Sequence, residues 1–322
     1  MIYQFTHSMC YFAKNYFALK IIFLGTPDFA VESLKAIVDA GFNVVAVVTA
    51  PDKPAGRGMH LQQSPVKKIA IEKNIPVLQP VKLKDENFIA ELKSYEADLQ
   101  VVIAFRMLPL AVWNMPKLGT INLHASLLPD YRGAAPINRA IMNGEMETGV
   151  CTFFLKHEID TGDLVMQKKI PIGKYMNAGE LHDILMNTGA ELIVETLRKI
   201  ESGSYQTIPQ GNNSNKFAPK IFTADCKINW NDKGETIYNT IRGLSPYPAA
   251  FTELDGKILK IYNADFIHTS DHKEQIGNYI TDGKTYLHFV CANGIIDLKE
   301  IQLAGKKRMM VEEMLRGYRK EN

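Results

Sequence analysis

Three polar residues in the middle of the chain have the types and the spacing that acyl transfer requires. Asn122 and His124 lie two positions apart in the run 119–124, and Asp160 follows in the segment 158–163. In a strand, residues i and i+2 point to the same face, so the amide and the imidazole project together. These two side chains can stabilise the negative charge that develops on a carbonyl oxygen when an amine attacks. A nearby carboxylate favours protonated histidine and can relay the proton of the amine.

Other chemistries fit the same region less well. Each of the three polar residues, taken singly, is also typical of a local hydrogen-bonding role at a strand end or turn. Ser126 lacks the Gly-x-Ser-x-Gly elbow of a serine nucleophile, which argues against covalent catalysis. The cysteines lack the spacing of a disulfide framework or a zinc site, so no metal is predicted; they are Cys10, Cys151, Cys226 and Cys291.

The elements that position these residues alternate between strand and helix patterns. From Ile21 onward the sequence predicts strand 21–24, helix 27–40, strand 44–48, helix 86–92 and strand 99–104. That order indicates an α/β fold with a doubly wound, Rossmann-like parallel sheet. The turn after the first strand has Gly25 but lacks the other glycines of Gly-x-Gly-x-x-Gly, which disfavours an NAD-linked dehydrogenase.

Further helices are predicted at 138–142 and 181–200. His182 falls within the second helical pattern, so we interpret it as a core or surface residue. His157 is nearer to Asp160 in the sequence but lacks a partner at strand spacing. It is therefore expected to be at most a second polar contact.

A linker divides the chain. Residues 203–215 are rich in Ser, Gln, Gly and Asn, which is typical of a connecting segment. Beyond it, Asp-Gly and Asn-Gly turns separate short strands that suggest a small β-barrel: 227–230, 251–254, 258–262, 286–290 and 295–301. We therefore expect an N-terminal extension at 1–19, a catalytic domain at 20–202, a linker at 203–222 and a second domain at 223–322.

Composition limits the class of protein. The chain has 322 residues, of which 46% are hydrophobic and 22% charged, and this is long enough for two domains with their own cores. The net charge of +2 is too small to indicate a dedicated nucleic-acid binder. No apolar run has membrane-spanning length, and the N-terminal residues match neither a signal peptide nor a transit peptide. We expect a cytoplasmic protein with reduced thiols and no membrane contact.

Residues 51–65 show neither helical nor strand periodicity. Structureless loops of this length in a compact domain are usually functional or disordered. Its basic residues outnumber its acidic ones, so the loop is suited to nucleic-acid phosphates or a base edge. A mobile, solvated loop is the alternative.

Three sequence runs carry a resemblance to a known family. Asn-x-His at 122–124, Ser-Leu-Leu-Pro-x-x-Arg-Gly at 126–133 and Asp-Thr-Gly-Asp at 160–163 resemble the signature of folate-dependent formyltransferases. The continuation Arg-Gly-Ala-Ala-Pro-Ile at 132–137, with a match from about residue 20 to the C-terminus, is similar to the branch that formylates methionyl initiator tRNA. The resemblance implies 10-formyltetrahydrofolate as co-substrate, no metal, a role in translation initiation and an OB-like second domain.

The resemblance also implies roles for individual residues. Asn122, His124 and Asp160 would be catalytic. The expected substrate-binding residues are Phe29, Ser126, Leu127, Leu128, Pro129, Arg132 and Gly133. Those expected to contact tRNA are Arg57 in the 51–65 loop, Lys216 and Lys220 near the linker, and Lys306, Lys307 and Arg308. No obligate protein partner is implied.

The chain departs from the family at one place, and two rival functions stay open. Family members commonly have Ala-Tyr-Gly after the third strand, whereas this chain has Ala-Phe-Arg at 104–106. Arg106 would reach either the glutamate tail of the donor or the solvent. One rival is a formyltransferase for an amino sugar nucleotide or a ribonucleotide amine. The other is a non-catalytic RNA-binding protein on the same scaffold, which the joint presence of Asn122, His124 and Asp160 disfavours.

Overall fold

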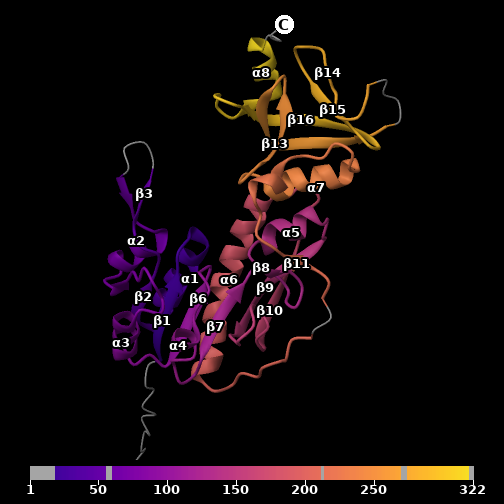
Figure 1. The fold of residues 1–322 in the computed structure, drawn as a ribbon. Coiled ribbons are helices and arrows are strands. Elements are labelled where there is room, and N and C mark those ends of the chain that lie inside the picture. Colours follow the sequence, from indigo (N-terminus) through magenta and orange to yellow (C-terminus); the bar gives the residue numbers. More distant parts are fainter. Residues whose placement is uncertain (1–18, 56–59, 212–213, 270–273, 319–322) are drawn as a thin grey trace, which may run out of the picture.

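The computed structural model describes residues 19–55, 60–211, 214–269 and 274–318. Its first sheet has seven strands (Figure 1). From one edge to the other they are Leu164–Pro171 (β10), Glu147–Phe154 (β9), Thr120–His124 (β7), Leu99–Ile103 (β6), Lys20–Gly25 (β1), Asn43–Val48 (β2) and Val77–Leu78 (β5). The five strands from β7 to β5 are parallel, and β9 and β10 add an antiparallel edge.

Helices cover both faces of this sheet because its strands alternate between two apolar cores. In β1, Ile21 and Phe23 join the core with Asp28–Asp39 (α1) and Ala178–Glu201 (α6). Ile22 and Leu24 face the opposite core, which holds apolar side chains of Glu86–Ser94 (α3) and Leu110–Trp113 (α4). The predicted doubly wound parallel sheet is confirmed.

The expectation of a structureless loop at 51–65 is wrong. Lys53–Ala55 (β3) and His60–Gln62 (β4) form an antiparallel ribbon, and Pro65–Glu72 (α2) follows. The side chain of Ser64 caps this helix by accepting a hydrogen bond from the Lys67 backbone N–H at 3.0 Å. Three-residue strands that pair only with each other leave too short an alternation to be found in the sequence.

The second sheet is antiparallel and curled (Figure 1). Its path is Ala250–Leu254 (β12), Lys257–His268 (β13), Gly294–Leu303 (β16), Leu287–Cys291 (β15) and Tyr279–Thr281 (β14), with Met309–Met310 (β17) paired to β16. Gly234–Leu244 (α7) packs into its core, and Val311–Gly317 (α8) follows β17. The expected fold class, a Rossmann-like sheet followed by a small barrel-like β domain, is confirmed.

The strand predicted at 227–230 is wrong. Only Lys227 makes a bridge, to Phe251, after the 3-10 helix Thr223–Cys226 (η1). Ile228 is buried in the second core and Trp230 stacks on Phe289 with ring centroids 4.6 Å apart. The apolar residues of this segment, Ile228 and Trp230, do pack into the second core, but from a turn and not from a strand.

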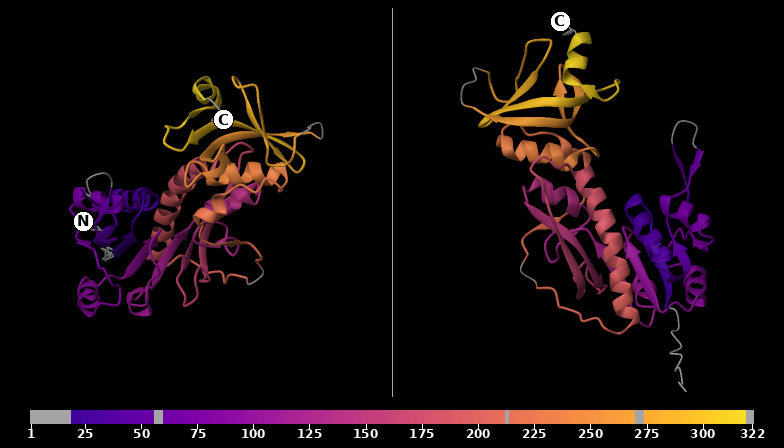
Figure 2. Two further views of the ribbon diagram at one scale, coloured as in Figure 1. Left: turned by 45° about the horizontal axis from the view of Figure 1, so that its top comes forward. Right: turned by 180° about the vertical axis from the view of Figure 1, so that it is seen from behind.

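Helix α7 joins the two halves of the molecule. It packs on Pro136–Met142 (α5), where Asn138 Nδ2 donates to the Gly243 carbonyl at 2.7 Å. The Gly179 N–H, at the start of α6, donates to the Ser245 carbonyl at 3.1 Å. Figure 2 shows α6 running along the first sheet up to α7, which lies against the second sheet. The curled sheet is thereby anchored to the helices of the first half.

The segment between α6 and α7 returns along the first half. Leu164 and Ile208 form an isolated bridge, and Phe217–Ala218 (β11) pairs in parallel with Arg132–Gly133 (β8). The expected linker is therefore attached to the loop that follows β7, next to the predicted catalytic residues.

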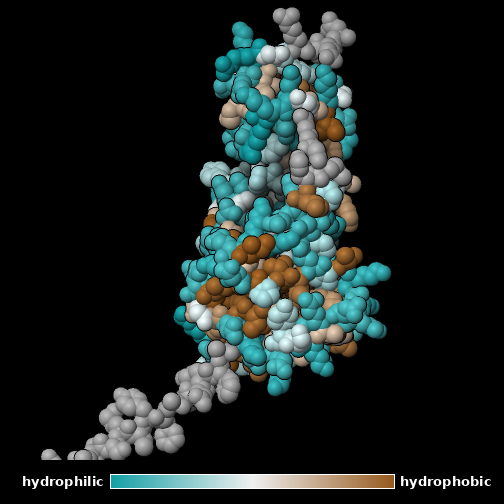
Figure 3. Space-filling model, turned by 90° about the vertical axis from the view of Figure 1, so that its left-hand side faces the viewer, coloured by the Kyte–Doolittle hydropathy of each residue, from teal (hydrophilic) through white to brown (hydrophobic). Residues whose placement is uncertain are grey.

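The surface of the half that carries β2, α2 and α3 is mixed. Figure 3 shows mostly hydrophilic residues on this side, with a group of hydrophobic residues on its lower part. Large exposed apolar side chains of the chain include Val81, Met107 and Leu110. Among the described helices, none has both the length and the apolar character needed to cross a membrane.

Candidate active site

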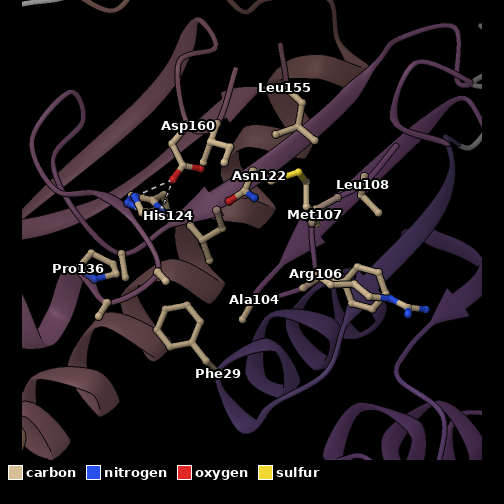
Figure 4. Close-up of a pocket in the computed structure, with 18 of the residues that line it drawn as sticks. Phe29, Ala104, Arg106, Met107, Leu108, Asn122, His124, Pro136, Leu155 and Asp160 are labelled. Carbon is tan, nitrogen blue, oxygen red and sulfur yellow. Dashed lines mark hydrogen bonds and ion pairs between the residues drawn. The ribbon is translucent and has the colours of Figure 1, made fainter. Parts of the chain in front are cut away.

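A cavity of about 710 Å³ opens beside the carboxyl ends of β6 and β7. In doubly wound sheets this edge is where ligands bind. Asn122 and His124 both line the cavity. They alternate with Ile121 and Leu123, which belong to the core against α1 and α6, although Leu123 also reaches the cavity. The expectation that strand spacing brings the amide and the imidazole to one place agrees with this geometry (Figure 4).

Two neighbours define the environment of His124. Its Nε2 lies 2.9 Å from the carbonyl oxygen of Tyr131, and because a carbonyl only accepts, Nε2 carries the proton. Its Nδ1 faces Asp160 Oδ2 at 3.9 Å (Figure 4). His124 is 8% exposed and lines the cavity. The histidine and the carboxylate, far apart in sequence, form the pair that acyl transfer to an amine requires.

Asp160 lies in the loop between β9 and β10 and has a φ of +54°. Its Oδ2 accepts a hydrogen bond from the Gly133 backbone N–H at 2.9 Å, which fixes the carboxylate beside His124. Gly133 itself has a φ of +125°, and a Cβ there would lie 2.5 Å from the Ala218 carbonyl oxygen. Only glycine fits between the Asp160 carboxylate and strand β11.

The amide of Asn122 completes the polar end of the cavity. Its side chain makes no hydrogen bond to any residue in the described part of the chain, although it is half-buried. Its two N–H donors are thus available to a ligand. Together with His124 and Asp160, it gives the cavity donors and an acceptor within one short stretch of wall.

Much of the remaining wall is apolar. Phe29, Met107, Leu108 and Leu155 line it, together with Pro136 (Figure 4). Pockets for drug-sized ligands commonly span about 300–1,000 Å³ and combine an apolar lining with a few polar groups. The cavity therefore has the size and lining to hold a flat aromatic ring system next to its polar end.

Two further histidines line the cavity, and one of them, His182, has a different place from the one that the sequence suggested. His182 lines the cavity and makes an edge contact with Phe29, with ring centroids 5.3 Å apart. It is therefore neither a plain core residue nor a plain surface residue. His157 also lines the cavity, as expected for a second polar contact. The helical pattern gave no sign of the place of His182, because it does not show which residues near the start of α6 meet another helix, here α1 at Phe29.

Arg106 points away from the cavity (Figure 4). Its guanidinium donates to the carbonyls of Pro80 and Val81, the latter at 2.9 Å. The left-handed conformation in this loop occurs at Ala104, with a φ of +47°. Arg106 thus anchors the loop after β6 to the one after β5, and its side chain stays exposed to solvent, in line with one of the two alternatives.

The expected substrate-binding residues divide into two groups. Phe29 and Gly133 line the cavity. Ser126 is buried and donates to the Asp130 carbonyl at 2.6 Å, and Arg132 donates to Gln210 Oε1 at 2.8 Å. The rest of that run also lies outside the cavity lining: Leu127, Leu128 and Pro129. These residues shape the turn that carries Tyr131 and Gly133.

The expected tRNA-binding residues are spread over the molecule. Arg57 lies outside the described residues. Lys220 is exposed, with Nζ 5.4 Å from the centre of the exposed Phe222 ring. Lys216 pairs with Glu145 at 2.7 Å. The basic run before β17 is exposed but partly paired: Lys307 contacts Glu313 at 3.2 Å and Arg308 contacts Glu300 at 2.6 Å, beside Lys306.

The thiol nearest to the site is unsuited to nucleophilic chemistry. Cys151 pairs with His124 across β9 and β7 and is fully buried. Burial raises the pKa of the Cys151 thiol to about 12, so it stays protonated. In the described part of the chain, no group of three or more His, Cys, Asp or Glu side chains has the arrangement of a metal site.

Two family models match the chain. The model described as "Formyl transferase" matches residues 19–197, and "Formyl transferase, C-terminal domain" matches residues 220–319. The chain therefore belongs to the formyl transferase family. Within the family, a relative from Phocaeicola vulgatus named methionyl-tRNA formyltransferase is 55% identical over 312 residues, covering 94% of this chain and 96% of its own. A protein of the same name from Bacteroides thetaiotaomicron is 50% identical over 310 residues, with 94% and 96% coverage.

Solved structures share the fold at much lower identity. An N-formyltransferase from Helicobacter canadensis, in complex with folinic acid and dTDP-3-aminofucose, has a TM-score of 0.66 at 20% identity over 90% of this chain and 100% of its own. A sugar 3N-formyl transferase with dTDP and 5-N-formyl-THF has a TM-score of 0.65 at 20% identity, covering 90% and 99%. Both are similar to this chain along almost its whole length.

Proposed function

We propose that the protein transfers the formyl group of 10-formyltetrahydrofolate to the α-amino group of methionyl initiator tRNA, for translation initiation. The single observation that carries this proposal is the convergence of Asn122, His124 and Asp160 at one end of the 710 Å³ cavity. Relatives that are 50–55% identical over almost the full chain bear the name of this activity, which supports the choice of acceptor. The enzyme is thus a one-carbon acyl transferase.

The reaction exchanges one carbon–nitrogen bond for another. The amine nitrogen attacks the formyl carbon and loses a proton, while the bond from that carbon to the donor nitrogen breaks and the donor nitrogen gains a proton. Asn122 and protonated His124 stabilise the negative charge on the formyl oxygen in the transition state. Asp160 keeps its carboxylate beside the imidazole and takes part in removing the amine proton, and His124 returns a proton to the donor nitrogen.

The donor fits the apolar part of the cavity. Phe29, Leu108 and Leu155 offer flat or branched apolar surface, and Asn122 lies at the junction with the polar end. A ring system held there would place its one-carbon substituent beside the amide and the imidazole. The donor supplies an activated formyl group when bound, and the chain supplies the orientation and the charge stabilisation.

We further propose a division of labour along the chain. Residues 20–202 carry the chemistry, residues 203–222 connect, and residues 223–322 bind the body of the tRNA, after an extension at 1–19. Lys220 and the neighbouring exposed Phe222 offer a charge for phosphate and a ring for a base. The cluster Lys306, Lys307 and Arg308 adds charge at the end of the second sheet. Arg57, which lies outside the described residues, is the proposed contact for the acceptor end. The protein acts in the cytoplasm without an obligate protein partner.

Formyl transfer to defined acceptors tests the proposal. The purified protein is mixed with 10-formyltetrahydrofolate and, separately, methionyl initiator tRNA, methionyl elongator tRNA or an amino sugar nucleotide. Transfer to the initiator tRNA alone supports the proposal. Transfer to the sugar alone assigns the protein to the rival activity, and transfer to none contradicts a catalytic role. Asn122→Ala serves as the control, because it removes the amide and leaves the strand intact.

A further inference from the structure

The carbonyl that holds His124 belongs to a residue in an unusual conformation. Tyr131 has a φ of +61° although it is not glycine, and it is 4% exposed. The left-handed region costs an ordinary residue about 1–2 kcal/mol. Such a conformation persists only where the surroundings hold it. The Tyr131 carbonyl accepts the Nε2 proton of His124, so whatever holds Tyr131 also orients the imidazole.

Three hydrogen bonds hold Tyr131, and they come from different parts of the chain. Its backbone N–H donates to the Lys216 carbonyl at 2.7 Å. Its hydroxyl donates to Glu145 Oε1 at 2.7 Å and accepts from Asn143 Nδ2 at 3.1 Å. Burial and the hydrogen bond to Glu145 raise the pKa of the Tyr131 hydroxyl, so it remains a donor.

Lys216 closes this network from the connecting segment. Its Nζ lies 2.7 Å from Glu145 Oε1, 3.8 Å from Asp130 Oδ2 and 6.0 Å from the centre of the Tyr131 ring. The hydrogen bond to Glu145 raises the pKa of Lys216. Lys216 thus meets the same carboxylate oxygen as the Tyr131 hydroxyl, and contacts Tyr131 with both its backbone and its side chain.

The same segment also reaches the other catalytic partner. The strand after Lys216, β11, pairs with β8, placing Ala218 against Gly133. The Gly133 N–H donates to Asp160. Two neighbours of Arg132 in the sequence therefore position the catalytic pair. Tyr131 positions His124, and Gly133 positions Asp160.

We propose that Tyr131, Glu145 and Lys216 form a clamp that positions His124 for formyl transfer. Lys216 thus acts through the catalytic loop and not as a direct contact to tRNA phosphate. This proposal depends on the proposed function only for the kinetic measurements that test it. None of the three residues lines the cavity, so they are positioning residues.

Kinetics of full-length variants separate the two roles of Lys216. Lys216→Met is expected to lower kcat about tenfold, because a misplacement of even 1 Å in a catalytic group has effects of this order or larger. The KM for methionyl-tRNA stays within twofold, and Lys216→Arg restores most of kcat. Glu145→Gln has a similar effect, and Glu145→Gln combined with Lys216→Met is no worse than either alone, because both break one unit.

A surface ion pair of the same kind provides the matched control. Lys168 and Glu191 pair at 2.9 Å on exposed parts of β10 and α6. Lys168→Met should leave kcat and KM unchanged. A rise in the KM for tRNA with unchanged kcat in Lys216→Met would overturn the proposal and indicate a phosphate contact. An equal loss of kcat in Lys168→Met would also overturn it.

A second measurement does not depend on activity. Long-range proton–nitrogen NMR correlations distinguish the two ring nitrogens of histidine, and comparison with His124→Gln assigns the signal. The wild type is expected to carry the proton of neutral His124 on Nε2, whereas Tyr131→Phe and Lys216→Met show a mixture of tautomers. A single Nε2 tautomer in both variants contradicts the clamp. If the wild type fails to formylate any tRNA, yet the two variants show the expected change in tautomer relative to it, the proposed function fails and the clamp stands.

Discussion

The polar residues at the cavity of the first half and those near β16 in the second half are arranged in opposite ways. In the first half, Asn122, His124 and Asp160 all line a cavity, and only one ring nitrogen of His124, Nε2, makes a hydrogen bond to the protein. In the second half, several charged groups on or near β16 are paired with one another, as Arg308 is with Glu300 and Lys299 with Asp297 at 2.5 Å. The comparison indicates that a catalytic site needs polar side chains that face a cavity, whereas a surface that binds a partner can consist of side chains already in ion pairs.

The halves differ in the same way in their histidines. Burial lowers the pKa of His288 on β15, although Asp297 lies 3.3 Å from its Nε2. His124 and Asp160 line the 710 Å³ cavity, whereas His288 lines neither this cavity nor the second one, beside Lys20 and Asp98. A histidine–carboxylate pair alone therefore does not define a catalytic site, and the open cavity beside it makes the difference.

The largest effect is expected for the pair that lines the cavity, His124 and Asp160. His124→Ala should lower kcat about 10²–10³-fold, since loss of one preorganised oxyanion donor has effects of this size. The KM for tRNA should change little, because the side chain acts in the transition state. Single-turnover formylation with saturating donor measures the change. His288→Ala is the matched control and should leave kcat within a few-fold of the wild type. A loss of kcat as large as that of His124→Ala would contradict the contrast between the two histidines.

The next effect concerns the stability of the second half alone. Leu298 is 1% exposed in the core of the curled sheet, and Leu298→Ala should lower its free energy of unfolding by about 2–5 kcal/mol. Each half contains one tryptophan, Trp113 at the cavity and Trp230 against Phe289. Urea unfolding of Trp113→Phe and Trp230→Phe backgrounds therefore follows each half separately. Ile258→Ala, at a half-exposed position, is the control; coincident shifts of both tryptophan signals would show that the halves unfold as one unit.

A smaller effect is expected for the paired charges of the second half. Replacing Lys306, Lys307 and Arg308 together by alanine should raise the KM for tRNA about tenfold or less and reduce its salt dependence, with kcat unchanged. The effect is limited because Lys307 and Arg308 already pair with acidic side chains. Steady-state formylation at several salt concentrations measures it. A fall in kcat with unchanged KM would place this cluster in the catalytic step.

The smallest effect is a pH dependence of stability. Burial raises the pKa of Glu145, but hydrogen bonds from Lys216 and Tyr131 outweigh it, so the pKa lies below its usual value. A carboxyl group with a depressed folded-state pKa stabilises the protein above its unfolded-state pKa, and this contribution is lost as the pH falls through the folded-state pKa. Glu145→Gln should therefore lower the free energy of unfolding at pH 7 by less than about 1 kcal/mol, with a smaller difference near pH 3. Urea unfolding at both pH values measures it, and an equal difference at the two would exclude the ionised pair as the cause.

The sequence predicted what depends on local pattern. The βαβ order from β1 to β2 and the shared face of Asn122 and His124 follow from periodicities of a few residues. The turn motifs and the alternation beyond residue 222 also indicated a second β domain, although the strand expected at 227–230 is a turn.

Contacts between distant segments could not be predicted in this way. Nothing near His124 indicates that the Tyr131 carbonyl meets its Nε2, because this depends on a left-handed backbone held from Lys216. The place of His182 at the cavity depends on how α6 packs beside Phe29. Arg106 is bonded to the loop after β5, which its own neighbours in sequence do not reveal.

The parallel pairing of β11 with β8 has a consequence for dividing the protein into fragments. A polypeptide ending at residue 202 keeps every strand of the first sheet but loses the Lys216 carbonyl and the strand beside Gly133. A polypeptide ending near residue 219 keeps both. The segment whose composition is typical of a spacer thus belongs, by its hydrogen bonds, to the catalytic half, and a truncation series across it would reveal the true edge of that half.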